Sequence, residues 1–227
     1  MATNYNPRIV TDGLVLALDA GNTKSYNAGI STTAWTDLSG NGNNGTLTNG
    51  VGYNSSNGGS LDFDGVDDYV TIPAITLDKD NSAFSVWFTV GVDFTGNYGN
   101  RGIILGNNGD EFLSLFAISA QNNLQGETNT NENYYLGGFG TGDSSISNGW
   151  NNVQVSFENS IAKTYINGIL KYTSTTLTSD LTINEIVSSD ATANYQGNIA
   201  QVSIYNKSLT ASEIQQNFNA TRGRFGI

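Results

Sequence analysis

The chain has 227 residues, and its 20 acidic and 9 basic side chains give a formal net charge of −11 at pH 7. Because cysteine and histidine are both absent, disulfides, thiolate metal sites and Ser-His-Asp or Cys-His catalysis are excluded. The acidic balance argues against nucleic acids and anionic membranes as partners, since binding either one requires clustered Lys and Arg. Residues 1–8 contain no apolar run suited to a secretory signal, so we expect synthesis in the cytoplasm.

Alternation of apolar and polar residues, broken at short intervals by Gly, Asn, Asp and Ser, predicts antiparallel strands arranged in two sheets. Strands are expected near residues 13–19, 60–64, 67–72, 83–92, 101–106, 111–119, 134–139, 151–157, 161–166, 169–173, 183–188 and 197–205. The Asn- and Gly-rich segments 39–59, 95–109, 121–133 and 140–149 are expected to be loops. No shift in composition divides the chain, which favours one domain.

The segment from Gly40 to Gly45 matches the pattern G-x-G-x-x-G. A dinucleotide site also needs a helix that begins at these glycines, so that the pyrophosphate meets the helix N-terminus. Residues 46–53 are interrupted by glycine and have β character. We therefore interpret the segment as a turn-rich loop.

Four carboxylates lie within seven residues, at Asp62, Asp64, Asp67 and Asp68. Ca²⁺ prefers several oxygen ligands of this kind, although the spacing differs from that of an EF-hand. Asp62 and Asp64 share one face of their predicted strand, and Asp64-Gly65 is a natural start for a turn. Two interpretations stay open: Asp64 and Asp67 shape the turn by accepting backbone N–H bonds, or the aspartates bind Ca²⁺ together with loop oxygens from elsewhere.

Aromatic side chains in polar surroundings are candidates for glycan contact, because sugar rings stack on them while amides and carboxylates hold the hydroxyls. Four of them lie in or beside the Asn-rich segments: Tyr98, Tyr134, Tyr135 and Phe139. The tryptophans, Trp35, Trp87 and Trp150, are expected in the core instead.

Two local signals are specific. Asn167-Gly168 lies between two alternating runs, which predicts a tight hairpin with a type I′ turn. Thr210 and Glu213 form a capping box, and Leu209 and Ile214 occupy the positions of a hydrophobic staple. We expect one short helix at about residues 211–219, packed against the sandwich.

Four segments carry a resemblance to a known family: GLVLALD at 13–19, WTDLSGNG at 35–42, SLDFDGVDDYVTIP at 60–73 and GNIAQVSIYNKSLTASEIQQNF at 197–218. Together they resemble the laminin-G-like branch of the concanavalin A-like lectin/glucanase superfamily. The resemblance implies an all-β, two-sheet antiparallel jelly-roll sandwich with one short C-terminal helix. It places a laminin-G-like domain at residues 13–219, an N-terminal arm at 1–12 and a C-terminal tail at 220–227.

The resemblance also implies binding rather than catalysis. Hydrolases on this jelly roll usually carry Glu-x-Asp-x-x-Glu on one strand, and that pattern is absent here. The adjacent pair Asp110-Glu111 would point to opposite faces of a strand. Many family members bind Ca²⁺, but they often carry acidic residues where this chain has Ala200 and Gln201. We expect no enzymatic activity, and Ca²⁺ is the cofactor that the resemblance suggests.

Three of the basic residues, Arg8, Arg222 and Arg224, lie in the terminal segments, whereas the body of the chain is acidic. In the resembled fold the first and last strands are neighbours, which would bring both termini to one edge. We expect that edge to dock onto an acidic partner.

The opening DGLVLALDA and the closing Arg-Phe also resemble phage structural proteins. We therefore expect a non-enzymatic protein of the virion surface, a capsid decoration or tail-associated module made in the host cytoplasm. Its termini would anchor it to other virion proteins, and its loops would bind glycans. The alternative is a Ca²⁺-dependent carbohydrate-binding module of a bacterial adhesin or polysaccharide-degrading system.

Overall fold

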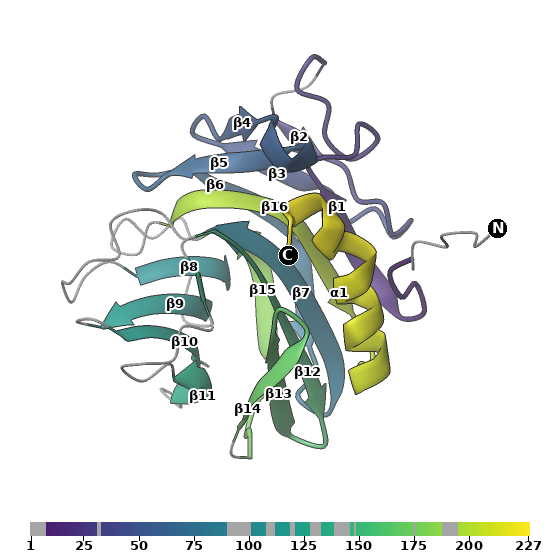
Figure 1. The fold of residues 1–227 in the computed structure, drawn as a ribbon, viewed down its shortest axis with the longest axis vertical. Coiled ribbons are helices and arrows are strands. Elements are labelled where there is room, and N and C mark those ends of the chain that lie inside the picture. The colour runs from purple at the N-terminus through teal and green to yellow at the C-terminus, as the bar shows by residue number, and fades with distance from the viewer. Residues whose placement is uncertain are drawn as a thin grey trace.

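The computed structural model of the protein describes residues 8–30, 33–89, 101–107, 112–118, 121–127, 133–138, 146, 147, 149–174, 176–187 and 195–227. For residues 101–104, 112–118, 121–127 and 133–138 it describes the backbone alone. Over these ranges the chain forms two antiparallel sheets packed face to face, with one α-helix outside them (Figure 1). The predicted two-sheet jelly-roll sandwich is confirmed.

Sheet A has the strand order β14-β13-β12-β7-β16-β5-β4, and β1 also pairs with β16. In chain order its strands are β1 (Leu14–Asp19), β4 (Gly52–Asn54), β5 (Ser60–Asp64), β7 (Asn81–Thr89), β12 (Trp150–Glu158), β13 (Ile161–Ile166), β14 (Ile169–Thr173) and β16 (Gln196–Tyr205). The first and last strands are therefore neighbours, as expected, with Leu18 opposite Val202.

Sheet B has the order β11-β10-β9-β8-β15-β6-β3-β2. Its strands are β2 (Ala34–Trp35), β3 (Gly45–Thr48), β6 (Tyr69–Leu77), β8 (Arg101–Gly106), β9 (Phe112–Ile118), β10 (Gln121–Glu127), β11 (Asn133–Gly138) and β15 (Leu181–Ile186). In Figure 1, β8 to β11 lie on the opposite side of the molecule from the helix.

The hydrophobic core lies between the sheets, because alternate residues of each strand point inward. Phe63 of β5, Phe84 of β7 and Val202 of β16 are all buried there. Trp35 is buried in the same core, and Trp87 is buried on the other face of sheet A, so the expected burial of both is confirmed. Trp150 is only partly buried, at the beginning of β12.

The hairpin between β13 and β14 has the predicted turn. Asn167 and Gly168 both have positive φ, 49° and 78°, as a type I′ turn requires. The Asn167 side chain also joins the turn to β12, since its Oδ1 accepts a hydrogen bond of 2.8 Å from the backbone N–H of Asn152.

Four strands were not predicted. β2 falls outside every predicted strand, β3 and β4 lie within 39–59, and β10 lies within 121–133. The first three are only two to four residues long, too short for an alternation to be recognised. β10 reads QNNLQGE and is mostly polar; it is a strand because β9 and β11 hydrogen-bond to it on both sides.

Helix α1 (Ala211–Phe225) begins at the predicted capping box, with Thr210 Oγ1 accepting from the Glu213 N–H and the Glu213 side chain accepting from Thr210 N–H. The expectation that the helix ends near residue 219, followed by a tail, is wrong. The helix continues to Phe225 and closes at Gly226 in the left-handed conformation, φ 75°.

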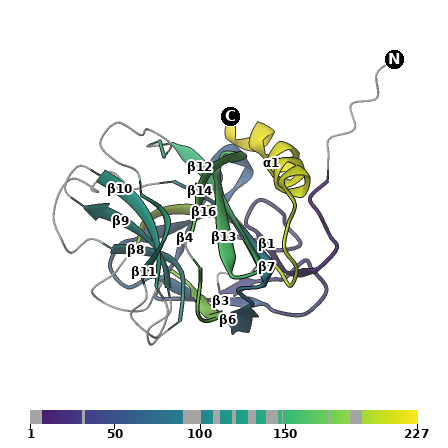
Figure 2. The same cartoon turned by 90° about the horizontal axis from the view of Figure 1, so that it is seen from below.

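Aromatic stacking fixes α1 on the outer face of sheet A (Figures 1 and 2). The Phe225 ring lies 4.1 Å from that of Trp87 and 4.6 Å from that of Trp150, and the Phe218 ring stacks on Trp87 at 5.9 Å. The Trp87 indole N–H donates to Thr221 Oγ1 at 2.9 Å. Burying a side chain such as Phe225 contributes about 2 kcal/mol, so the last turn is held by its own contacts.

Within the part of the chain that is described, no helix has the length and apolar character needed to span a membrane.

Candidate functional site: the acidic turn between β5 and β6

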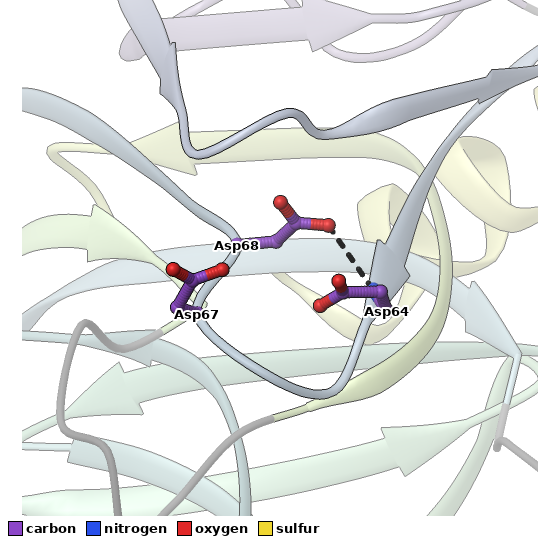
Figure 3. Close-up of side chains that lie close together, drawn as sticks. All are labelled: Asp64, Asp67 and Asp68. Carbon is purple, nitrogen blue, oxygen red and sulfur yellow. Dashed lines mark hydrogen bonds between the residues drawn. The ribbon is translucent and has the colours of Figure 1, made fainter.

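The turn at residues 64–68 connects sheet A to sheet B (Figure 3). Asp64 Oδ1 accepts from the backbone N–H of Val66 at 2.8 Å, and Asp68 Oδ2 accepts from the N–H of Asp64 at 3.1 Å. Gly65 has φ 80°, and a Cβ there would lie 2.9 Å from Cβ of Gln196, so the tight passage needs glycine. The predicted shaping of the turn is therefore confirmed at Asp64, but the second carboxylate that accepts a backbone N–H is Asp68 and not Asp67, as was expected.

The same turn gathers three carboxylates. One oxygen from each of Asp64, Asp67 and Asp68 lies within 4.8 Å of the other two. Asp68 is only 5% exposed, and its Oδ1 is buried without a hydrogen-bond partner. Asp62, the fourth predicted metal candidate, lies outside this group; it is exposed on β5, opposite Gly52 and Asn198.

The three charges are not neutralised by any ion pair among the described residues. Burial raises the pKa of Asp68, and the charges of Asp64, Asp67 and Asp62 raise it further against the lowering effect of the Asp64 N–H bond. Burial and the charge of Asp64 raise the pKa of Asp62 as well. The turn is an electronegative segment that holds one incompletely hydrogen-bonded carboxylate.

Several other strand ends lie at the same end of the sandwich. Gln196, where β16 begins, pairs with Asp64, and Thr89, where β7 ends, pairs with Trp150. Ile186, where β15 ends, pairs with Val70 beside the turn. The chain therefore leaves or enters segments 90–100, 139–149 and 188–194 near the acidic turn.

Two of the four glycan-contact candidates, Tyr98 and Phe139, lie outside the described residues. Tyr134 and Tyr135 belong to β11, where they pair with Gly126 and Gln125 and only the backbone is described. Their predicted contact with glycans stays a prediction.

Asp37 is a second buried aspartate, and the sequence analysis did not single it out. Its Oδ1 accepts from the N–H groups of Ala17 and Ser39, each at 2.9 Å. Its Oδ2 accepts from Ser39 Oγ at 2.7 Å and from Asn43 N–H at 3.0 Å. Burial alone would raise the pKa of Asp37, but these hydrogen bonds lower it.

The loop that matches G-x-G-x-x-G is built around Asp37. The chain enters strand β3 at Gly45, with no helix at the glycines, so the interpretation as a turn-rich loop is confirmed. The buried carboxylate acts as an internal anchor that joins this loop to β1.

The predicted docking residues have different surroundings. Arg224 donates to Asp19 Oδ1 at 2.6 Å and to the backbone carbonyls of Asn57 and Gly59, so the expectation that it faces a partner is wrong. Arg222 is exposed, with its guanidinium 5.8 Å from the centre of the Phe218 ring. Arg8 is exposed, and its carbonyl accepts from Gln216 of α1. Docking through Arg8 and Arg222 stays a prediction.

Comparison with known families identifies the fold. The family described as the concanavalin A-like lectin/glucanases superfamily, of the laminin-G type, matches residues 63–215. The chain belongs to this superfamily. No curated protein sequence matches it.

Solved members with the same jelly roll include binding domains. The receptor-binding domain of botulinum neurotoxin D superposes with a TM-score of 0.67 at 18% identity, covering 92% of this chain and 52% of that one. The serotype D domain in complex with N-acetylneuraminic acid gives 0.66 at 19%, covering 92% and 51%. The chain thus spans about half the length of these toxin domains.

A third similar structure is domain 4 of AbnA, an extracellular arabinanase of Geobacillus stearothermophilus, in complex with arabinotriose. It gives a TM-score of 0.64 at 16% identity and covers 90% of this chain and 97% of that domain. At these identities the likeness establishes the fold.

Proposed function

We propose that the chain is a non-enzymatic glycan-binding module whose acidic turn binds Ca²⁺ at the loop-bearing end of the jelly roll. The observation that carries the proposal is the buried Oδ1 of Asp68, which has no hydrogen-bond partner and lies beside two further carboxylates. An unpaired buried carboxylate oxygen is costly unless a cation or a donor satisfies it.

The residues fit the cation. Ca²⁺–oxygen distances are about 2.3–2.6 Å, so oxygens around one ion lie within about 5 Å of one another. The three carboxylates meet this condition at 4.8 Å. Ca²⁺ takes about six to eight oxygens, so carbonyls, water or sugar hydroxyls would supply the rest. A bound Ca²⁺ would neutralise the turn and accept hydroxyl oxygens of a glycan.

Glycan binding is supported by the fold. Two structures with the same jelly roll contain a sugar, N-acetylneuraminic acid in one and arabinotriose in the other. The aromatic candidates Tyr98 and Phe139 belong to segments that the described strands reach at the end bearing the acidic turn. We propose that Tyr98 and Phe139 contact the glycan.

We also propose that the module is carried on a virion surface, made in the host cytoplasm and attached to other virion proteins. Its support is the resemblance of residues 12–20 and of Arg224-Phe225 to phage structural proteins. Mass spectrometry of purified virions tests this placement. Recovery of the chain only from a bacterial adhesin or polysaccharide-degrading system would favour the alternative instead.

A glycan array with Ca²⁺ or with EDTA tests the principal proposal. The wild type should bind its glycans with Ca²⁺ and lose them with EDTA, and Asp68→Asn should lose them in both conditions. Asp62→Asn is the matched control, because Asp62 lies on β5 with Asp64 but outside the group of three carboxylates. This variant should bind glycans as the wild type does. The Ca²⁺ site is contradicted if no glycan on the array depends on Ca²⁺ for its binding, and release of reducing ends from a bound polysaccharide would contradict a purely binding role.

A further inference from the structure

A polar pocket of about 570 Å³ lies between the C-terminal half of α1 and the end of β1. Its walls come from Asp19 and residues 21–23, from Gly58 in the 3-10 turn η1 (Ser56–Gly58), from Gln201 of β16, and from residues 219–221, 223 and 224 of α1. Its volume falls within the range of about 300–1,000 Å³ that is typical of small-molecule sites. Strand β5, about 13 Å long at 3.3 Å per residue, separates it from the acidic turn.

Arg224 makes one wall of this pocket rigid. Its Nε donates to the carbonyl of Asn57 at 2.6 Å, Nη1 to Asp19 Oδ1 at 2.6 Å, and Nη2 to the carbonyl of Gly59. These bonds join the end of α1 to η1 and β1. The pocket is therefore formed before any ligand enters, which reduces the entropy lost on binding.

The charged groups of the pocket already have partners. Asp19 Oδ1 accepts from Arg224 and from the N–H of Gly21 at 2.9 Å, and Oδ2 accepts from Gln201 Nε2 at 2.8 Å. An anion would have to compete with three acceptors for the guanidinium, and a cation would have to displace three donors from the carboxylate. This arrangement disfavours charged ligands.

Neutral polar groups remain available. Gln201 uses its Nε2 on Asp19, and its Oε1 has no hydrogen bond to any residue described. The side chains of Asn219 and Thr23 likewise form no hydrogen bond within the described part of the chain, and both line the pocket. Amides and a hydroxyl can both donate and accept, which matches the paired donor and acceptor character of sugar hydroxyls.

Gly223 keeps the pocket open. It lies inside α1 with an ordinary helical backbone, and a Cβ built there would have no atom within 4 Å. Glycine in a helix costs about 1 kcal/mol relative to alanine, and neither backbone conformation nor crowding requires it here. The glycine leaves open space beside the pocket that it borders.

We propose that this pocket is a second binding site, specific for a neutral, hydroxyl-rich small molecule of about one or two sugar rings. It is independent of Ca²⁺ and does not rest on the glycan-binding role of the acidic turn. The free Oε1 of Gln201 and the side-chain amide of Asn219 bind hydroxyls, and the Asp19–Arg224 pair forms a fixed wall that rejects charge.

Saturation-transfer NMR in EDTA tests the proposal with neutral sugars, namely arabinose, galactose, glucose, N-acetylglucosamine and their disaccharides. At least one of these sugars should show saturation transfer from the wild type, and to the same extent from Asp68→Asn. Gly223→Trp, which fills the open space without straining the backbone, should raise its Kd at least tenfold. Asn219→Ala should raise it about three- to tenfold, as expected for one lost hydrogen bond.

Ser212→Trp is the matched control, because Ser212 is exposed in the first turn of the same helix, outside the pocket. It should bind as the wild type does, and the circular dichroism of all variants should be unchanged. No transfer to any neutral sugar, equal binding by Gly223→Trp, or equal binding of galacturonate and galactose would overturn the proposal. If EDTA-resistant binding survives in Asp68→Asn while the glycan array shows nothing Ca²⁺-dependent, only the acidic-turn proposal fails.

Discussion

Asp37 and Asp68 are both nearly buried aspartates in glycine-containing connections between strands, yet their surroundings are opposite. Both oxygens of Asp37 are occupied by four donors, and the pKa of this carboxyl is lowered. Asp68 receives one backbone donor, one of its oxygens has none, and neighbouring carboxylates help to raise its pKa. The first is fully hydrogen-bonded and anchors its loop, whereas the second has one oxygen without a donor, which is where we propose that a cation binds.

The contrast shows that burial and residue type do not separate structural from ligand-binding aspartates. What separates them is the number of donors that reach each oxygen. Charge-assisted hydrogen bonds that are already present leave no free acceptor for a metal. An incompletely bonded acid among other acids is destabilised until a ligand arrives.

The largest expected effect comes from two isosteric substitutions whose free energies of unfolding are compared without Ca²⁺. Asp37→Asn should lower the free energy of unfolding by about 3 kcal/mol, because it removes charge-assisted hydrogen bonds and turns an amide N–H₂ toward donors. Asp68→Asn should change it by less than about 0.5 kcal/mol or raise it, because it relieves repulsion. Urea unfolding followed by circular dichroism measures both. Equal losses of unfolding free energy would mean that the two carboxylates stabilise the fold to the same extent, which would contradict the comparison.

Added Ca²⁺ should distinguish the two aspartates by the stabilisation that each variant gains from it. Free Ca²⁺ at about 100 times its Kd should stabilise the wild type by about 2.7 kcal/mol. Asp68→Asn should show no stabilisation and Asp64→Asn a reduced one, while Asp37→Asn, although weaker, should respond as fully as the wild type. Thermal unfolding across a Ca²⁺ titration gives these shifts, with Mg²⁺ as a control for general screening of charge. Equal responses in all variants would remove the acidic turn as the site.

The smallest expected effect is in the pH dependence without metal. The folded pKa of Asp37 lies below the ordinary 3.8, so its stabilising contribution is present above pH 3.8 and is lost as the pH falls through the folded value. The folded pKa of Asp68 lies above 3.8, so its unfavourable contribution appears as the pH rises from 3.8 through the folded value. The advantage of Asp68→Asn over the wild type should therefore disappear on acidification. Unfolding curves in EDTA between about pH 3 and 6 measure this, and an advantage that grows on acidification would reverse our assignment.

Local chemistry made part of the fold and site predictable. The Asn167-Gly168 turn and the Thr210–Glu213 capping box depend on residues a few positions apart, so the sequence contains all the partners. The Asp64, Asp67 and Asp68 group was predictable for the same reason. Asp62 faces the same side of β5 as Asp64, but one pleat repeat places it about 6–7 Å farther along the strand.

Distant contacts account for what sequence reasoning missed. The end of α1 depends on Phe225 stacking with Trp87 and Trp150, which lie far away in the chain. The role of Asp37 depends on the N–H of Ala17, and the loss of Arg224 as a docking residue depends on Asp19. No periodicity or spacing reveals such partners before the strands are placed.

The position of β16 has a consequence for how the protein reaches this structure. This strand follows every other strand in the chain, yet it lies inside sheet A and pairs with β1, β5 and β7. During synthesis, β7 and β5 cannot acquire their shared neighbour until residues 196–205 leave the ribosome. Sheet A is therefore expected to form only after β16 has been synthesised, and to form slowly, as is usual for sheets closed by pairings of long sequence separation.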